Sequence, residues 1–209
     1  FGYRRQRQMC IRDRSNIFTV LIDAQEYHSP HPTKGFKVKR PRAKEMHFLS
    51  HKEIDTLLAE LSGDSLKIAK LCLATGARWG EAESLKGSNV VKGRVTFVDT
   101  KNGLNRTVPI SQDLEKEIVS GSNGRLFRDC YQNFYSVLKK CEFELPRGQA
   151  SHVLRHTFAS HFIMNAGNIL ALQKILGHAT IQQTMTYAHL APDYLQDALK
   201  FNPLVRSTN

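Results

Sequence analysis

The sequence has no apolar run close to the roughly 18 residues that a membrane-spanning helix requires. We therefore exclude a membrane protein that spans the bilayer with a helix. Its four cysteines are far apart and form no CxxC pair, and the first residues contain no apolar secretory segment. We therefore expect a reduced, cytoplasmic protein. Because the chain begins with Phe1 and not with methionine, we also expect it to be a fragment.

Acidic residues are scarce. Thirty Lys and Arg stand against nineteen Asp and Glu, which gives a formal net charge of +11. Such an excess favours a polyanionic partner, with nucleic acid ahead of an acidic membrane surface. The 209 residues, of which 41% are hydrophobic, are enough for one or two domains with a core of their own.

Basic residues are concentrated in residues 1–44, which hold eleven Lys and Arg against three acidic residues. Residues 1–14 lack clear periodicity, whereas residues 15–27 predict a short helix. The Pro-, Gly- and Lys-rich segment that follows is typical of an exposed linker, so we place a domain boundary near residue 45. Its basic run, KVKRPRAK, is compatible with a solvated linker, a localisation-like signal or a segment lying on phosphates.

From residue 46 the pattern predicts a mainly helical domain with a small antiparallel β-sheet, an α+β fold. Ser50 and Glu53 form the capping box of an amphipathic helix that ends at Gly63. Further helices are predicted at residues 66–74, 81–85, 111–119, 133–141, 151–165, 169–176 and 181–189.

Two short β-rich runs, residues 94–100 and 106–110, flank the dipeptide Asn102-Gly103. Asn-Gly between two such runs is a strong signal for a tight turn. The sequence therefore predicts a β-hairpin with Lys101 at its bend.

Two arginines are candidates for phosphate binding, because a guanidinium pairs with two phosphate oxygens and keeps its charge. Arg78 follows Gly76, a glycine that is expected to end a helix. Arg155 lies three residues after His152, so we expect the two on one helix face. Taken alone, each arginine fits an ordinary surface residue better than a catalytic one.

The histidines invite a metal interpretation, since His152 and His156 have the i, i+4 spacing of a zinc-binding helix. The glutamate of the HExxH motif is missing, however, and Arg155 occupies the same turn. We therefore expect no metal site, and we expect His156 and His161 to pack in the core. A histidine remains the natural proton carrier at neutral pH.

Tyr187 lies nine residues after His178. A phenol has a pKa of about 10 and is a poor nucleophile unless cations and a proton acceptor surround it. As a single residue, Tyr187 fits a packing role.

Five motifs occur in one order: ATGxRxxE, TKNG, HxLRH, LGH and TxxY. This combination resembles the catalytic domain of the tyrosine recombinase (phage integrase) family over residues 46 to about 200, most of all the integrases of temperate phages. The resemblance implies the tyrosine recombinase catalytic fold for residues 46–209. For residues 1–45 it implies a remnant of the core-binding domain with its basic linker.

The resemblance also assigns roles. The implied catalytic residues are Arg78, Lys101, His152, Arg155, His178 and the nucleophile Tyr187, with Glu81 as a supporting acidic residue. Tyr187 would attack the scissile phosphate and form a 3′-phosphotyrosyl link, while Arg78, Arg155 and His178 stabilise the charge on phosphorus. Lys101 would protonate the 5′ oxygen, and His152 would assist proton movement at the nucleophile. No metal or nucleotide cofactor is implied.

The implied partners are double-stranded DNA attachment sites, accessory DNA-bending proteins and further copies of the chain. A homotetramer on DNA would form through the amphipathic C-terminal segment, residues 192–201, although the pattern fits a core-packing helix equally well. The implied location is the cytoplasm of a bacterial host. Two alternatives stay open: strand nicking and resealing like that of a type IB topoisomerase, and a DNA-binding remnant without catalytic activity.

Overall fold

The computed structural model describes residues 2–33, 46–98, 103, 105–119, 124–146, 148–150, 152–192 and 199, with the backbone alone for residues 2–9 and 12. Lys101 and nearly all of the predicted C-terminal helix therefore lie outside the described residues. The chain divides into two compact units, residues 1–45 and 46–209, and each is described by itself. Within the described ranges, no helix is both long and apolar enough to cross a bilayer.

The first unit contains one long helix, α1 (Gly2–Asp23). The helix predicted over residues 15–27 is present but ends at Asp23, and it begins at Gly2, within the stretch in which no periodicity was found. The Arg, Gln and Met residues that crowd the start of the segment are good helix formers, so local propensity extends the helix where no apolar stripe marks it. After the helix the chain turns back, and Phe18 packs edge-on against Tyr27 and His31, with ring centroids 5.2 and 6.1 Å apart.

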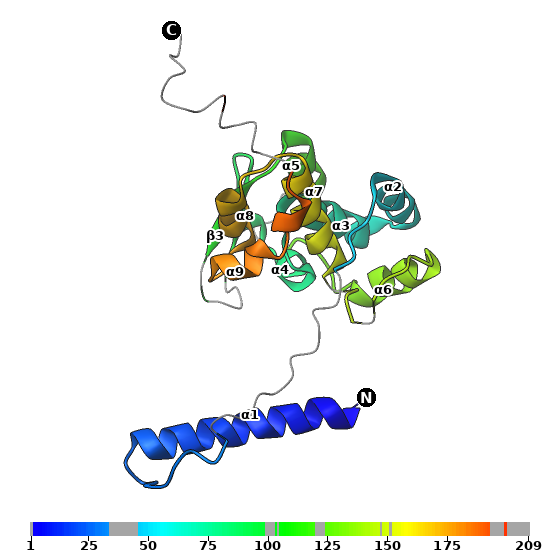
Figure 1. Cartoon of the computed structure of the whole chain (residues 1–209). Coiled ribbons are helices and arrows are strands. Elements are labelled where there is room, and N and C mark those ends of the chain that lie inside the picture. Colours follow the sequence, from blue (N-terminus) through cyan, green and yellow to red (C-terminus); the bar gives the residue numbers. More distant parts are fainter. Residues whose placement is uncertain are drawn as a thin grey trace, which may run out of the picture. The chain divides into compact units, whose positions relative to one another are not determined.

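The second unit is built around two central helices, α3 (Gly63–Thr75) and α7 (Val153–Met164), which pack against each other (Figure 1). The other helices are α2 (His51–Glu60), α4 (Trp79–Glu83), α5 (Gln112–Ile118), α6 (Tyr131–Lys140), α8 (Ile169–Leu176) and α9 (Ile181–Met185). Two 3₁₀ turns, η1 (Gly87–Asn89) and η2 (Ala188–Leu190), complete the described helical elements. In Figure 1, α2 and α6 lie on one side of the central pair, and α8, α9 and the sheet lie on the other.

Local capping signals locate several helices correctly. The capping box at the start of α2 is confirmed, since the Ser50 side chain accepts from the Glu53 backbone and the Glu53 carboxylate accepts from Ser50. The helix predicted at residues 181–189 is shorter than expected. It breaks after Met185, and Tyr187 lies between α9 and η2.

The sheet has three antiparallel strands in the order β1 (Val90–Val91), β2 (Arg94–Phe97) and β3 (Arg106–Pro109). The predicted pairing of the two longer strands is confirmed, with Val95 opposite Val108. Burial alternates along both strands, so one face of the sheet joins the core. The two-residue strand β1 is too short for a sequence pattern and was not predicted. At the hairpin bend, only Gly103 belongs to the described residues.

Candidate active site

Arg155 is deeply buried, with 4% of its surface exposed. Its Nη1 donates to the Gly76 carbonyl and its Nη2 to the Leu176 carbonyl, both at 2.8 Å. These carbonyls lie at the C-terminal ends of α3 and α8, where unpaired carbonyls and the helix dipole favour a cation. The two helix ends thus fix the guanidinium in one orientation.

Two glycines let the helix ends converge on this arginine. Gly76 and Gly177 both have a φ of +65°, the left-handed conformation that ends a helix. A Cβ on Gly76 would lie 2.6 Å from Cδ2 of Leu176 and 2.6 Å from Cδ1 of Phe158. Only glycine therefore allows α3 and α8 to approach each other closely enough to share Arg155.

Arg78 belongs to a partly buried ion triad with Glu81 and Arg106. Arg78 is the residue before α4, and its Nη1 lies 2.7 Å from Oε1 of Glu81. Nη2 of Arg106 donates to the other oxygen, Oε2, at 2.6 Å. Burial alone would raise the pKa of Glu81, but the hydrogen bonds from Arg106 and Arg78 outweigh it and lower the pKa to about 2. The glutamate therefore holds both arginines as a full carboxylate.

Arg106 is a site residue that sequence reasoning did not single out. It is paired with Phe97 across the sheet, and its guanidinium carbon lies 4.6 Å from the centre of that ring. The side chain is only 6% exposed, and its Nε and Nη1 are buried with no hydrogen-bond partner among the described residues. One signal was available: alternation places residue 106 on the same face of β3 as buried Val108, and an inward arginine requires a counter-charge.

His178 follows the glycine that ends α8, and its Nδ1 lies 2.8 Å from Oγ1 of buried Thr184. The pKa of His178 is lowered to about 4, first by burial and then by the positive charges of Arg155, Arg78 and Arg106. At pH 7 the imidazole is therefore neutral. All three arginines therefore lie near enough to this ring to disfavour its charged form.

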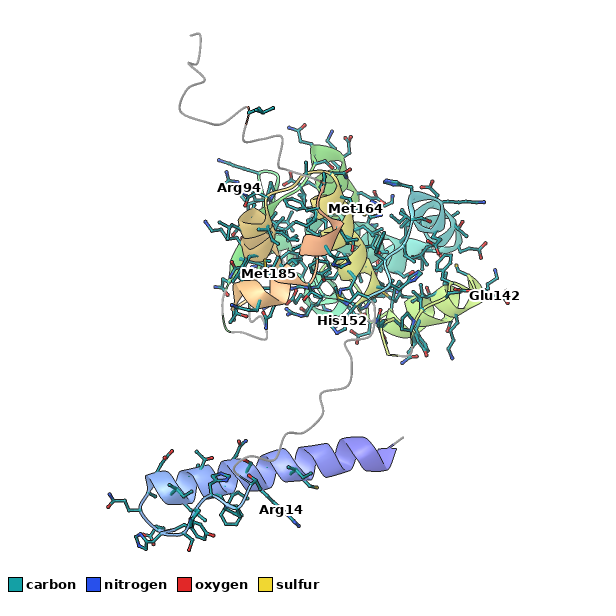
Figure 2. The ribbon with its side chains drawn as sticks, viewed as in Figure 1. Arg14, Arg94, Glu142, His152, Met164 and Met185 are labelled. Carbon is teal, nitrogen blue, oxygen red and sulfur yellow. The ribbon has the colours of Figure 1, made fainter. Side chains whose placement is uncertain are left out.

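Tyr187 is 3% exposed, and its hydroxyl oxygen lies 2.7 Å from Nδ1 of His156. Burial raises the pKa of the phenol to about 12, although the charge of Arg155 acts in the opposite direction. His152 is the residue before α7, as Figure 2 shows near the lower end of that helix, so it does not lie on a helix face as expected. Its ring centre is 6.1 Å from that of His156.

Most of the predicted site residues meet in one place. Arg78, Glu81, Arg155, His178 and Tyr187 converge from α4, α7 and the segments that follow α8 and α9. His156, which was expected to pack, also contacts the Tyr187 hydroxyl. Lys101 lies outside the described residues. A cluster of guanidiniums and neutral imidazoles beside a phenol can bind a phosphodiester and present a nucleophile to it.

Comparisons with known proteins point to one family. The model of the phage integrase family matches residues 47–193. The integrase of Escherichia phage P2 is 51% identical over 191 residues, which cover 91% of this chain and 57% of the relative. The integrase of Haemophilus phage HP1 is 48% identical over 192 residues, which cover 90% of this chain and 57% of that one. The chain thus spans less than two thirds of the length of these relatives.

Solved structures agree with the sequence matches. The catalytic domain of the bacteriophage HP1 integrase has a TM-score of 0.73 and 53% identity, and the match covers 77% of this chain and 97% of that domain. The XerH site-specific recombinase bound to a difH substrate has a TM-score of 0.59 at 19% identity, with 85% of this chain and 60% of that one covered, which shows a shared fold. Its sequence, its mainly helical fold with a small sheet, and both kinds of match show that this chain belongs to the phage integrase family.

Proposed function

We propose that this chain is the catalytic part of a site-specific DNA recombinase that integrates and excises a phage genome. The observation that carries the proposal is the position of Tyr187, whose buried phenol lies close enough to the anchored guanidinium of Arg155 for each to shift the pKa of the other. A phenol next to a fixed phosphate-binding group is the arrangement that nucleophilic attack on a phosphodiester requires.

The proposed reaction proceeds by transesterification. The oxygen of Tyr187 attacks phosphorus, a 3′-phosphotyrosyl bond forms, and the 5′ oxygen leaves with a proton that the family resemblance assigns to Lys101. Arg155 and Arg78 stabilise the charge that develops on the phosphoryl oxygens, and His178 adds a neutral hydrogen-bond donor. Because one phosphoester bond replaces another, a second 5′-hydroxyl can reverse the step on a new strand.

The arginines are already fixed in place before DNA binds, and this preorganisation should lower the free energy of the transition state. The pKa of Arg155 is lowered to about 10, first by burial and then by the charges of Arg78 and Arg106, which Glu81 offsets only in part, so repulsion between the cations remains before an anion binds. A bound phosphate relieves this repulsion, and the additional charge of the transition state relieves it further.

The proposed partner is double-stranded DNA. The net charge of +11 supplies the electrostatic attraction, and binding should weaken with salt by roughly 0.9 log units in affinity per log unit of salt for each phosphate neutralised. Several structural neighbours are described as complexes with DNA, among them the XerH complex and the Tn1549 transposon integrase. We further propose a homotetramer on DNA joined by the C-terminal segments, accessory DNA-bending proteins, and action in the bacterial cytoplasm.

A trapping experiment tests the proposed function. Nicked duplexes with a randomised core serve as suicide substrates, because cleavage next to the nick releases a short oligonucleotide and leaves the protein attached to DNA. The wild type should give a covalent adduct on a denaturing gel, and sequencing of the attached DNA identifies the site. Tyr187→Phe should bind the recovered duplex with unchanged affinity and give no adduct.

The same substrates separate the alternatives. If neither protein forms an adduct while both bind DNA, the chain is a non-catalytic DNA-binding remnant. If the adducts show no sequence preference and the protein relaxes a supercoiled plasmid without a selected site, its activity is of the topoisomerase type. A selected site and strand transfer to a second duplex support a recombinase.

A further inference from the structure

His156 touches the atom that would carry out the attack, although the family resemblance gives it no role. Its Nδ1 lies 2.7 Å from the Tyr187 hydroxyl oxygen. We propose that His156 is a catalytic residue that accepts the proton of the Tyr187 hydroxyl as the phenol oxygen attacks phosphorus. This inference rests on the proposed function and adds a residue to it.

The fold fixes both members of the pair. His156 follows Arg155 directly within α7, and its backbone N–H donates to the His152 carbonyl at 2.9 Å. The backbone N–H of Tyr187 donates to the Thr184 carbonyl at 3.0 Å, and its ring belongs to the apolar cluster that also contains Leu176. The short distance between imidazole and phenol therefore comes from two well-anchored segments.

The protonation state of His156 suits an acceptor. Burial, together with the charges of His152 and Arg155, lowers its pKa to about 4, so the ring is neutral at pH 7. In the tautomer with its proton on Nε2, the lone pair of Nδ1 faces the hydroxyl. The phenol itself needs an acceptor, because burial raises its pKa to about 12.

The same values keep the nucleophile inactive without DNA. The pKa of Tyr187 lies far above that of His156, so proton transfer between them is unfavourable at rest. A phosphodiester bound to Arg155 offsets the positive charge that disfavours the imidazolium, and the forming bond to phosphorus withdraws negative charge from the phenol oxygen. Transfer therefore accompanies attack and does not precede it.

The step balances without any further reagent. The O–H bond of Tyr187 breaks and its proton forms an N–H bond with Nδ1 of His156, while the phenol oxygen bonds to phosphorus and the bond from phosphorus to the 5′ oxygen breaks. The leaving oxygen takes a proton from the general acid, for which Lys101 is the proposed residue. In the rejoining step, the imidazolium of His156 returns its proton to the departing phenol oxygen.

The test uses the suicide duplex selected above and follows formation of the covalent adduct in a single turnover. His156→Asn places an amide close to the position of Nδ1, so it can hold the hydroxyl by a hydrogen bond but cannot take up a proton at neutral pH. Loss of a general base should slow cleavage by about 10² to 10⁴-fold with unchanged DNA affinity. The matched control is His161→Gln on the same helix, whose native ring bonds the Leu49 carbonyl at 2.8 Å; it should cleave at the wild-type rate.

A more acidic nucleophile separates proton transfer from positioning. Ring-fluorinated tyrosine introduced at position 187 has a lower phenol pKa and depends less on a base, so it should restore much of the rate of His156→Asn. If His156→Asn cleaves like the wild type, or if the fluorinated phenol rescues His152→Asn and not His156→Asn, the proposal is wrong. Failure of the wild type to form any adduct would instead refute the proposed function.

Folding of the Asn variant is checked by thermal unfolding. If that variant does not fold, His156→Ala assayed with added imidazole provides the second test. Imidazole in solution should accelerate adduct formation by the Ala variant and leave the wild-type rate unchanged. No acceleration in a folded Ala variant would overturn the assignment.

Discussion

Replacing Glu81 by glutamine should destabilise the protein by about 3 kcal/mol at pH 7. The pKa of Glu81 lies at about 2 in the folded protein against an ordinary value of 4.5, and each pKa unit corresponds to about 1.36 kcal/mol. Solvent screens the pair little, because the carboxylate side chain is 11% exposed and that of Arg106 6%. Glutamine keeps the shape but leaves Arg106 buried without its counter-charge, and this loss is the main part of the 3 kcal/mol.

The difference between wild type and Glu81→Gln should depend on pH. A carboxylate with a lowered folded pKa stabilises the protein fully above its unfolded pKa, and this stabilisation is lost as the pH falls through the folded pKa. For Glu81 the difference should stay near 3 kcal/mol from pH 7 to pH 5 and fall to about 1.4 kcal/mol at pH 3. Urea unfolding at each pH measures it, with fluorescence of Trp79, the single tryptophan, as the probe.

The control is Glu60→Gln, since Glu60 pairs with Lys140 at the surface, where the two side chains are 43% and 73% exposed. This substitution should leave the free energy of unfolding nearly unchanged. A difference between wild type and Glu81→Gln that stays constant from pH 7 to pH 3 would refute the ionised triad, because a neutral hydrogen bond would give that result.

Three further substitutions test the site. Gly76→Ala should cost about 3 kcal/mol of unfolding free energy, because it combines left-handed backbone strain with two clashes of the new Cβ. Its control, Gly63→Ala, has open space around the Cβ position and should cost about 1 kcal/mol. Thermal unfolding compares the two variants, and equal losses would refute the close approach of the helix ends. Arg155→Lys should slow cleavage on the order of 10² to 10³-fold, since one ammonium nitrogen cannot reproduce the planar guanidinium whose two nitrogens hold separate carbonyls; adduct kinetics measure it. Thr184→Val should slow cleavage by roughly tenfold through loss of the hydrogen bond to His178, and an unchanged rate would show that this bond does not orient the ring.

Local signals in the sequence located much of the fold. The capping box of Ser50 and Glu53, the helix-ending Gly177 and the two β-rich runs each involve neighbouring residues, and the structure contains the elements they predict. The helical start of α1 was missed because it has favourable propensity without an apolar stripe. The break before Tyr187 was missed because the apolar pattern continues through it.

The missed parts of the site depend on contacts between distant residues. Arg106 is on a strand 25 residues from the carboxylate that neutralises it, and His156 is 31 residues from Tyr187. No window of sequence contains either pair, so periodicity and spacing could not reveal them. The family motifs identified the other site residues, because the order of these motifs along the chain is typical of proteins in which the same residues come together in space.

The two carbonyls that hold Arg155 lie 79 residues before it and 21 residues after it in the chain. Newly made chains that have not yet docked the ends of α3 and α8 therefore lack an oriented guanidinium next to the phenol. We expect such immature molecules to adhere to DNA through their charge without breaking it. Under the proposed function, strand cleavage would then be restricted to molecules that have finished folding.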